Sequence, residues 1–175
     1  PSKQCHVNLM PDSDKKFVLL SIGANLGDKQ KTIEHAFELI KEAQVLDEPV
    51  LSSLYETEPV GFKDQPWFMN AAIAGYTDMP VNNLIKLLKS IEYVLGRKVR
   101  QRWHEREIDI DILLYGENYF ATEYLTVPHP KMHERRFVLV PASEIAGTAH
   151  HPVLDCTIDG LLEICEDRSE VKRLR

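Results

Sequence analysis

The segment Ile108–Ile112 alternates isoleucine and aspartate without interruption, and it constrains the fold more than any other stretch. Alternation with a period of two is typical of a half-buried strand, so the isoleucines face a core while Asp109 and Asp111 face away from it. Residues two apart on one strand face are separated by only about 7 Å. Two carboxylates at this range raise each other's pKa unless a cation or solvent compensates. The strand is therefore either a solvated surface or one wall of a cation site.

Length and composition exclude several broad classes of protein. The 175 residues, 43% hydrophobic and 27% charged, are typical of a globular domain that buries one core. We expect residues 1–15 to form a flexible polar lead-in to a single domain over residues 16–175. Apolar runs are far shorter than the roughly 20 residues that span a bilayer, so we expect a cytoplasmic protein that binds no membrane. Three irregularly spaced cysteines favour a reducing compartment, and the net charge of −6 argues against nucleic-acid binding.

A basic segment, residues 97–106, leads directly into the two aspartates. It holds five cationic side chains against one acidic side chain, namely Arg97, Lys98, Arg100, Arg102 and Arg106 against Glu105. A charge run of this kind is usually a solvated loop. Beside a pair of carboxylates, however, it also has the composition that binding of a metal and a polyphosphate requires.

The order of predicted elements indicates the fold class. Strands are expected over residues 16–23, 49–58, 67–77 and 107–115, which are rich in strand formers. Helices are expected from Asp28 to about Leu46 and over 80–96, where apolar residues recur at helical spacing. The resulting β-α-β-β-α-β order is the ferredoxin-like plan, an α+β fold with helices packed on an antiparallel sheet. C-terminal additions follow, including a short helix near 158–166 that Thr157 or Asp159 caps.

The residue types around the two aspartates favour phosphoryl-group chemistry. Mg²⁺ binds to one or two carboxylates together with substrate phosphates and water, and two metal ions can share such carboxylates. Arg102 and Arg106, on either side of Trp103, are suited to bidentate hydrogen bonds with phosphate oxygens.

The strand at 67–77 carries a second pattern with two interpretations. Phe68 and Asn70 face the same side, which places an aromatic ring beside an amide that can both donate and accept. This pair is suited to stack on a planar heterocycle and to bind its polar edge. A phenylalanine of the core beside a structural asparagine has the same pattern, so both interpretations stay open.

Four segments resemble the 6-hydroxymethyl-7,8-dihydropterin pyrophosphokinase family. They are SIGANLGD, YETEPVGFKDQPWFMNAA, RWHEREIDIDILLYG and TVPHPKMHERRFVLVPASEIA, in that order within residues 17–146. The family pattern R-x-x-D-[LIV]-D is met from Arg106 to Asp111, whereas His104 stands where the family usually has a small residue. The resemblance implies an ATP- and Mg²⁺-dependent diphosphotransferase of folate biosynthesis. Such an enzyme would transfer pyrophosphate from ATP to the hydroxymethyl group of the pterin and release AMP.

The resemblance also implies roles for particular residues. Asp109 and Asp111 would bind two Mg²⁺ ions and, with Arg102 and Arg106, form the catalytic set. The implied ATP contacts are Glu92, Arg102, Trp103, Arg106, Ile112, His129 and Arg135. The implied pterin contacts are Thr57, Pro59, Val60, Phe68, Asn70 and Phe137. The expected partners are the two substrates and other folate-pathway enzymes, and the expected state is a monomer.

Two rival functions use the same features. One is a different Mg²⁺-dependent phosphotransferase or nucleotide hydrolase, against which the Phe68 and Asn70 pair argues because it suits a heteroaromatic acceptor. The other is a catalytically silent ferredoxin-like module that senses a nucleotide, against which the presence of both aspartates argues.

Overall fold

The computed structural model of the protein describes residues 14–96 and 107–174. The elements up to the carboxylate strand are, in order, β1 (Lys16–Ala24), α1 (Lys29–Glu42), β2 (Asp47–Leu51), β3 (Tyr55–Thr57), β4 (Phe68–Thr77), α2 (Val81–Val94) and β5 (Asp109–Tyr115). The predicted ferredoxin-like order is confirmed, and the basic segment 97–106 lies outside the described residues, as does nearly all of the predicted lead-in.

The predicted strand over 49–58 is divided into two strands. The backbone N–H of Ser52 donates to the carbonyl of Ala72, and the Ser52 hydroxyl accepts from the N–H of Ala72. The next N–H, that of Ser53, donates to the Glu144 carboxylate at 2.5 Å rather than to a neighbouring strand. This change of partner separates β2 from β3, although both pair with β4.

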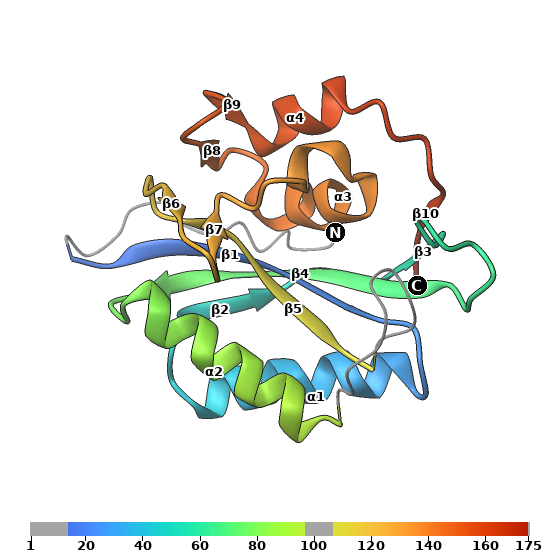
Figure 1. Cartoon of the computed structure of the whole chain (residues 1–175), viewed down its shortest axis with the longest axis horizontal. Helices are drawn as coiled ribbons and strands as arrows, with labels where there is room; N and C mark the ends of the chain where they lie inside the picture. The colour runs from blue at the N-terminus through green and yellow to red at the C-terminus, as the bar shows by residue number, and fades with distance from the viewer. Residues whose placement is uncertain (1–13, 97–106, 175) are drawn as a thin grey trace, which may run out of the picture.

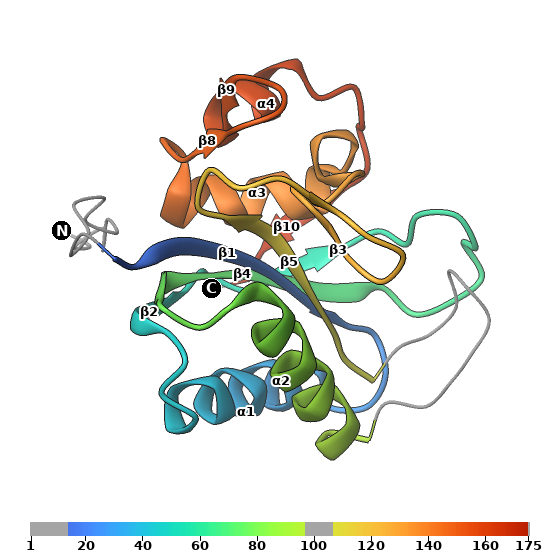
Figure 2. The ribbon, with the colours of Figure 1, turned by 60° about the vertical axis from the view of Figure 1, so that its left-hand side comes forward.

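The sheet is antiparallel throughout and includes a C-terminal strand, β10 (Val171–Arg173). The strand order is β10-β3-β4-β1-β5, with β2 paired to β4. Helices α1 and α2 cover one face, and α3 (Arg136–Ala146) and α4 (Ile158–Ile164) lie on the other side (Figures 1 and 2). None of the helices in the described residues is long and apolar enough to cross a membrane.

The two long helices follow from local sequence signals. Helix α1 begins after Asp28, whose side chain accepts from the N–H of Lys31 at 3.1 Å. It ends at Glu42, earlier than predicted, and Gln44 beyond it adopts a left-handed φ of 54° that a helix cannot continue through. Helix α2 ends as predicted before Gly96, which has a φ of 87°.

Alternation along the strands produces a core on each face of the sheet. Val18, Leu20 and Ile22 of β1 pack toward α1 and α2, whereas Leu19 packs toward α3 with Ala72 and Ala74 of β4. Further along the α3 face, β1 and β4 carry Ser21, Gly23 and Asn70 instead of large apolar side chains. The apolar core on this face therefore gives way to a polar region.

The C-terminal additions contain short elements that the sequence did not predict. These are β6 (Phe120–Ala121), β7 (Thr126–Val127), a 3₁₀ helix (Met132–Glu134), β8 (His150–His151), β9 (Cys156–Thr157) and β10 (Val171–Arg173). The predicted short helix is confirmed as α4, and the Thr157 hydroxyl caps it by accepting from the N–H of Gly160 at 3.1 Å.

Candidate active site

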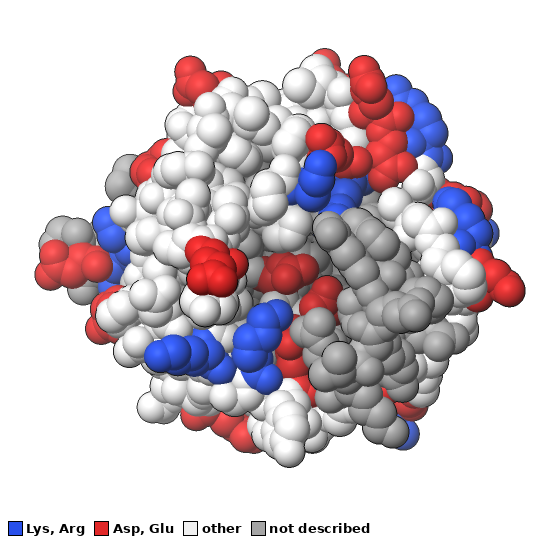
Figure 3. Space-filling view, in the orientation of Figure 1, with Lys and Arg blue, Asp and Glu red and all other residues white. Residues whose placement is uncertain are grey.

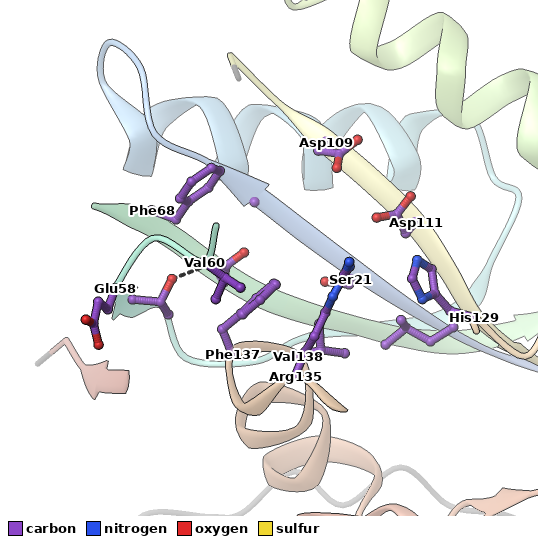
Figure 4. A pocket seen from close by; sticks show the side chains of 14 residues that line it. Ser21, Glu58, Val60, Phe68, Asp109, Asp111, His129, Arg135, Phe137 and Val138 are labelled. Carbon is purple, nitrogen blue, oxygen red and sulfur yellow. Dashed lines mark hydrogen bonds between the residues drawn. The ribbon is translucent and has the colours of Figure 1, made fainter. Parts of the chain in front are cut away.

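A pocket of about 260 Å³ occupies the polar region of the α3 face (Figure 4). Its lining residues come from β1, β3, β4, β5 and α3 and from the segments beside them, namely Ser21, Gly23, Thr57, Glu58, Val60, Phe68, Asn70, Asp109, Asp111, Leu113, His129, Arg135, Phe137 and Val138. Figure 3 shows acidic side chains in the hollow of the face seen in Figure 1, with basic side chains around them. The pocket thus combines carboxylates, cations and aromatic rings.

The two aspartates project from β5 into this pocket, side by side (Figure 4). The predicted alternation is confirmed, because Ile108 and Ile110 are fully buried on the opposite face. Desolvation in the pocket and the neighbouring Asp109 carboxylate raise the pKa of Asp111 to about 7, against the opposing effect of Lys89. The pair is therefore not a freely solvated surface, and a bound cation would relieve its unfavourable electrostatics.

The carboxylate pair fits Mg²⁺ better than a metal held wholly by protein ligands. Within residues 14–96 and 107–174, no cluster of three or more histidine, cysteine or acidic side chains could hold a metal ion. Mg²⁺ retains several waters and commonly takes one or two carboxylates together with substrate phosphates. Two adjacent aspartates in an otherwise open pocket meet this requirement.

Helix α2 holds the strand that carries the aspartates. The Glu92 carboxylate accepts from the N–H of Ile110 at 2.7 Å and from the Lys89 ammonium at 3.1 Å. Lys89 also donates to the carbonyl of Ile110 at 3.4 Å. Glu92 is only 2% exposed, and its contacts include those with β5 and Lys89. Its contact with ATP stays a prediction.

The other end of the pocket presents an amide and two aromatic rings. The Asn70 amide donates to the Thr57 hydroxyl at 2.5 Å between adjacent strands, and both side chains are buried. Phe68 and Phe137 are half-buried and line the pocket from β4 and α3 (Figure 4). The predicted pairing of Phe68 with Asn70 on one face is confirmed by their shared place in the lining.

His129 and Arg135 line the pocket near the aspartates. Desolvation and the nearby Arg135 charge lower the pKa of His129 to about 4. The Nδ1 atom of His129 accepts from the N–H of Lys131 at 3.1 Å, so the proton of the neutral ring lies on Nε2. The Arg135 guanidinium lies 5.9 Å from the centroid of the Phe137 ring. These groups offer neutral and cationic hydrogen-bond donors to an anion.

Comparison with known proteins identifies the family. The family described as 7,8-dihydro-6-hydroxymethylpterin-pyrophosphokinase (HPPK) matches residues 19–147. The chain belongs to this family. The 2-amino-4-hydroxy-6-hydroxymethyldihydropteridine pyrophosphokinase of Bacillus subtilis is 40% identical over 126 residues, which cover 72% of this chain and 75% of that protein. The Aquifex aeolicus protein of the same name is 37% identical over 136 residues, 78% of this chain and 84% of that one.

Longer proteins also contain this unit. The mitochondrial folate synthesis bifunctional protein of Arabidopsis thaliana is 38% identical over 132 residues, which are 75% of this chain but 24% of that protein. Among solved structures, wild-type Plasmodium falciparum HPPK-DHPS with pteroate aligns with a TM-score of 0.67 and 15% identity, covering 85% of this chain and 42% of that one. At this identity the likeness concerns the fold alone.

The structure brings most, but not all, of the predicted HPPK residues to the pocket. Nine line it, namely Thr57, Val60, Phe68, Asn70, Asp109, Asp111, His129, Arg135 and Phe137. Pro59 is buried and is not part of the lining, and the Ile112 side chain packs in the core on the opposite face of the sheet. Arg102, Trp103 and Arg106 lie outside the described residues.

The lining also includes residues outside the predicted set of site residues. Ser21 and Gly23 of β1 pair with Asp111 and Asp109 on one side, and Gly23 pairs with Asn70 on the other. A Cβ atom on Gly23 would overlap with the amide oxygen of Asn70. Gly23 stands at the end of a predicted strand, which is a sequence signal for close approach to the backbone. That it lies between Asn70 and Asp109 depends on the register of the strands. Glu58, Leu113 and Val138 gave no separate signal.

Proposed function

We propose that this chain transfers pyrophosphate from ATP to the hydroxymethyl group of 6-hydroxymethyl-7,8-dihydropterin, giving AMP and the pterin pyrophosphate, as a step of folate biosynthesis. The observation that carries the proposal is the composition of one pocket. A desolvated pair of carboxylates lies at one end, and an amide with two aromatic rings lies at the other. The Bacillus and Aquifex relatives carry the corresponding name, which supports this substrate pair.

The pterin occupies the end of the pocket near β3 and α3. Phe68 and Phe137 stack on the flat ring system, which favours a planar heterocycle over a sugar or an aliphatic alcohol. Asn70, fixed by its hydrogen bond to Thr57, binds the polar edge of the ring with its remaining amide groups. Because the Asn70 side chain is already oriented, little ordering is required when the pterin binds.

The triphosphate of ATP occupies the end formed by β5 and the N-terminus of α3. Asp109 and Asp111 would hold two Mg²⁺ ions, which would neutralise charge on the phosphate oxygens. The guanidinium of Arg135 and the Nε2–H of His129 donate to phosphate oxygens. Arg102, Trp103 and Arg106 of the basic segment complete the set of residues that bind ATP. The protein acts as a monomer, so that one chain forms one active site.

The reaction follows from the relative positions of the two substrates. The pterin hydroxymethyl oxygen attacks the β-phosphorus in line, so that a new O–P bond forms as the bond to the oxygen shared with the α-phosphorus breaks. AMP leaves with that oxygen, and the hydroxyl proton passes to solvent. Positioning and charge neutralisation supply most of the rate enhancement, because phosphoryl transfer needs little covalent assistance from the protein.

The direct test is to incubate the protein with ATP, Mg²⁺ and the pterin alcohol, and then to separate the nucleotides. AMP that forms only when the pterin is present supports pyrophosphoryl transfer. ADP would indicate a different phosphotransferase, and nucleotide binding without turnover would indicate the silent module. The Asp109→Asn variant is the matched control, since it removes one carboxylate from the pocket and is expected to form no AMP.

A further inference from the structure

The segment after α4 contacts two elements that line the pocket, although it lies beyond the residues that match the family. The family match ends at residue 147, and the chain then continues through α4 to β10 at the edge of the sheet (Figures 1 and 2). Residues 167–170 of this segment, which we call the C-terminal bridge, contact both α3 and the residues that follow β3.

At its first end the C-terminal bridge caps α3. The Asp167 carboxylate accepts from the backbone N–H of Arg136 at 2.9 Å. Helix α3 has no side-chain cap from Arg135, the residue before its first turn, so Asp167 satisfies an otherwise unpaired N–H from 31 residues away. The capped residue stands between Arg135 and Phe137, both of which line the pocket.

At its second end the C-terminal bridge holds Glu58 through two hydrogen bonds. The N–H of Glu58 donates to the carbonyl of Glu170 at 3.0 Å, and the N–H of Glu170 donates to the Glu58 carboxylate at 3.1 Å. The next residue, Val171, pairs with Thr57 in the sheet. Thr57 and Glu58 line the pocket, so this end fixes the wall formed by β3.

The connection between the two ends is short and internally bonded. Only Arg168 and Ser169 separate Asp167 from Glu170. The N–H of Ser169 donates back to the Asp167 carboxylate at 2.9 Å, and the Arg168 guanidinium donates to the carbonyl of Cys165 at 2.6 Å. A segment this short, with its turn closed by hydrogen bonds, holds its two attachment points at a nearly constant separation.

We infer that the C-terminal bridge sets the spacing between Phe137 on α3 and the Thr57–Glu58 wall, and thereby the affinity of the pocket for the pterin. This inference rests on the proposed function, because it assigns the pterin to that end of the pocket. Asp167 is then a positioning residue that acts through Arg136 without touching the substrate. An aromatic ring must lie parallel to its ligand to stack well, so a small rotation of the first turn of α3 reduces binding.

The experiment compares three variants with the wild-type protein by equilibrium titration with the pterin alcohol and by steady-state kinetics. Asp167→Ala removes the cap and is expected to raise the pterin Kd and KM by about fivefold, equivalent to about 1 kcal/mol of binding free energy. Asp167→Asn keeps an oxygen acceptor and is expected to restore most of the affinity. Glu166→Ala, at the exposed neighbouring residue, is expected to behave like the wild type.

The outcomes separate the inference from the proposed function. If the wild type binds the pterin and Asp167→Ala binds it equally well, the C-terminal bridge does not position the pocket and the inference is overturned. Equal loss in the Ala and Asn variants, with a lowered melting temperature in both, would also overturn it, because destabilisation alone would then explain the effect. A wild-type protein that does not bind the pterin would overturn the proposed function and this inference together.

Discussion

The buried carboxylate of Glu92 accepts a hydrogen bond of 2.7 Å from the backbone N–H of Ile110, the residue between the two aspartates of the active site. Among the strands of residues 14–96 and 107–174, β5 lies at the edge of the sheet, and none of them pairs with it on the side of this N–H. Helix α2 therefore supplies, through the Glu92 carboxylate, the hydrogen-bond acceptor that a neighbouring strand would otherwise provide. Together with the pairing of β5 to β1, this contact and the adjacent Lys89 contacts hold the strand that carries both carboxylates.

Replacing Glu92 with Ala is expected to lower both stability and turnover. The substitution leaves the N–H of Ile110 buried without an acceptor, which costs about 1–3 kcal/mol in the free energy of unfolding. Glu92→Gln retains an acceptor oxygen and is expected to lose less. Urea denaturation and kcat measurements test this, with the exposed Glu163→Ala as the control. A Glu92→Ala protein with wild-type stability would show that the contact is dispensable.

The Asp111→Asn substitution is expected to stabilise the metal-free protein while strongly reducing turnover. Desolvation and the Asp109 charge raise the folded-state pKa of Asp111 to about 7, so the folded state holds a proton that the unfolded state releases near pH 4. The contribution of Asp111 to the free energy of unfolding therefore decreases as the pH rises from about 4 to about 7, and asparagine removes this penalty.

Thermal unfolding without divalent cations at pH 8 and pH 4 tests the effect of Asp111→Asn. The variant should melt at a higher temperature than the wild type at pH 8, with a smaller difference at pH 4. Its kcat should fall by about 10²-fold or more, the scale of losing one electrostatic stabiliser. Added Mg²⁺ should raise the melting temperature of the wild type only. A variant that is less stable than the wild type at pH 8 would contradict the electrostatic account of the pair.

Adding a methyl group at Gly23 is expected to weaken pterin binding. A Cβ atom there would overlap with the Asn70 amide oxygen, so Gly23→Ala must displace Asn70 from its hydrogen bond with Thr57. The pterin KM is expected to rise by about tenfold, equivalent to about 1.4 kcal/mol. Steady-state kinetics at saturating ATP measure this change.

Gly27→Ala is the matched control for Gly23→Ala. Its added methyl meets no atom within 4 Å among the described residues other than its two chain neighbours, but its φ of 65° makes alanine unfavourable by about 1 kcal/mol. This variant should lose stability without a change in pterin KM. If both glycine variants bound the pterin equally well, the close approach of Gly23 to Asn70 would have no part in binding.

The His129 imidazole is expected to make the protein less stable in mild acid. Desolvation and Arg135 lower its folded-state pKa to about 4, while the unfolded state binds the proton below about 6.5. The contribution of His129 to stability is therefore lost as the pH falls from about 6.5 to about 4. His129→Gln should show a smaller decrease between pH 7 and pH 5 in denaturation experiments, whereas exposed His35→Gln should follow the wild type. Equal decreases in all three proteins would contradict this account.

Strand alternation predicted much of the site, because a period of two determines which residues share a face. It placed Asp109 with Asp111 and Phe68 with Asn70, and the structure has both pairs in the pocket lining. It could not predict that the two pairs meet, because β4 and β5 are neighbours only through β1. The register that places Gly23 between Asn70 and Asp109 depends on tertiary pairing rather than on local sequence.

The C-terminal segment gave no usable pattern in the sequence. Val171–Arg173 is mostly polar because β10 pairs at the edge of the sheet through its backbone, which any residue except proline can do. The cap that Asp167 provides comes from 31 residues away, so the signals that predict local helix caps could not identify it.

The most direct test of the central claim is to follow each phosphorus atom of ATP into the products. ATP labelled either at the β- or at the γ-phosphorus is incubated with Mg²⁺, the pterin alcohol and the protein, and the pterin product is isolated. Our account predicts that both labels appear in the pterin product in equal amounts, with one unlabelled AMP released for each product. A product that carries only the γ-label, together with ADP, would contradict it.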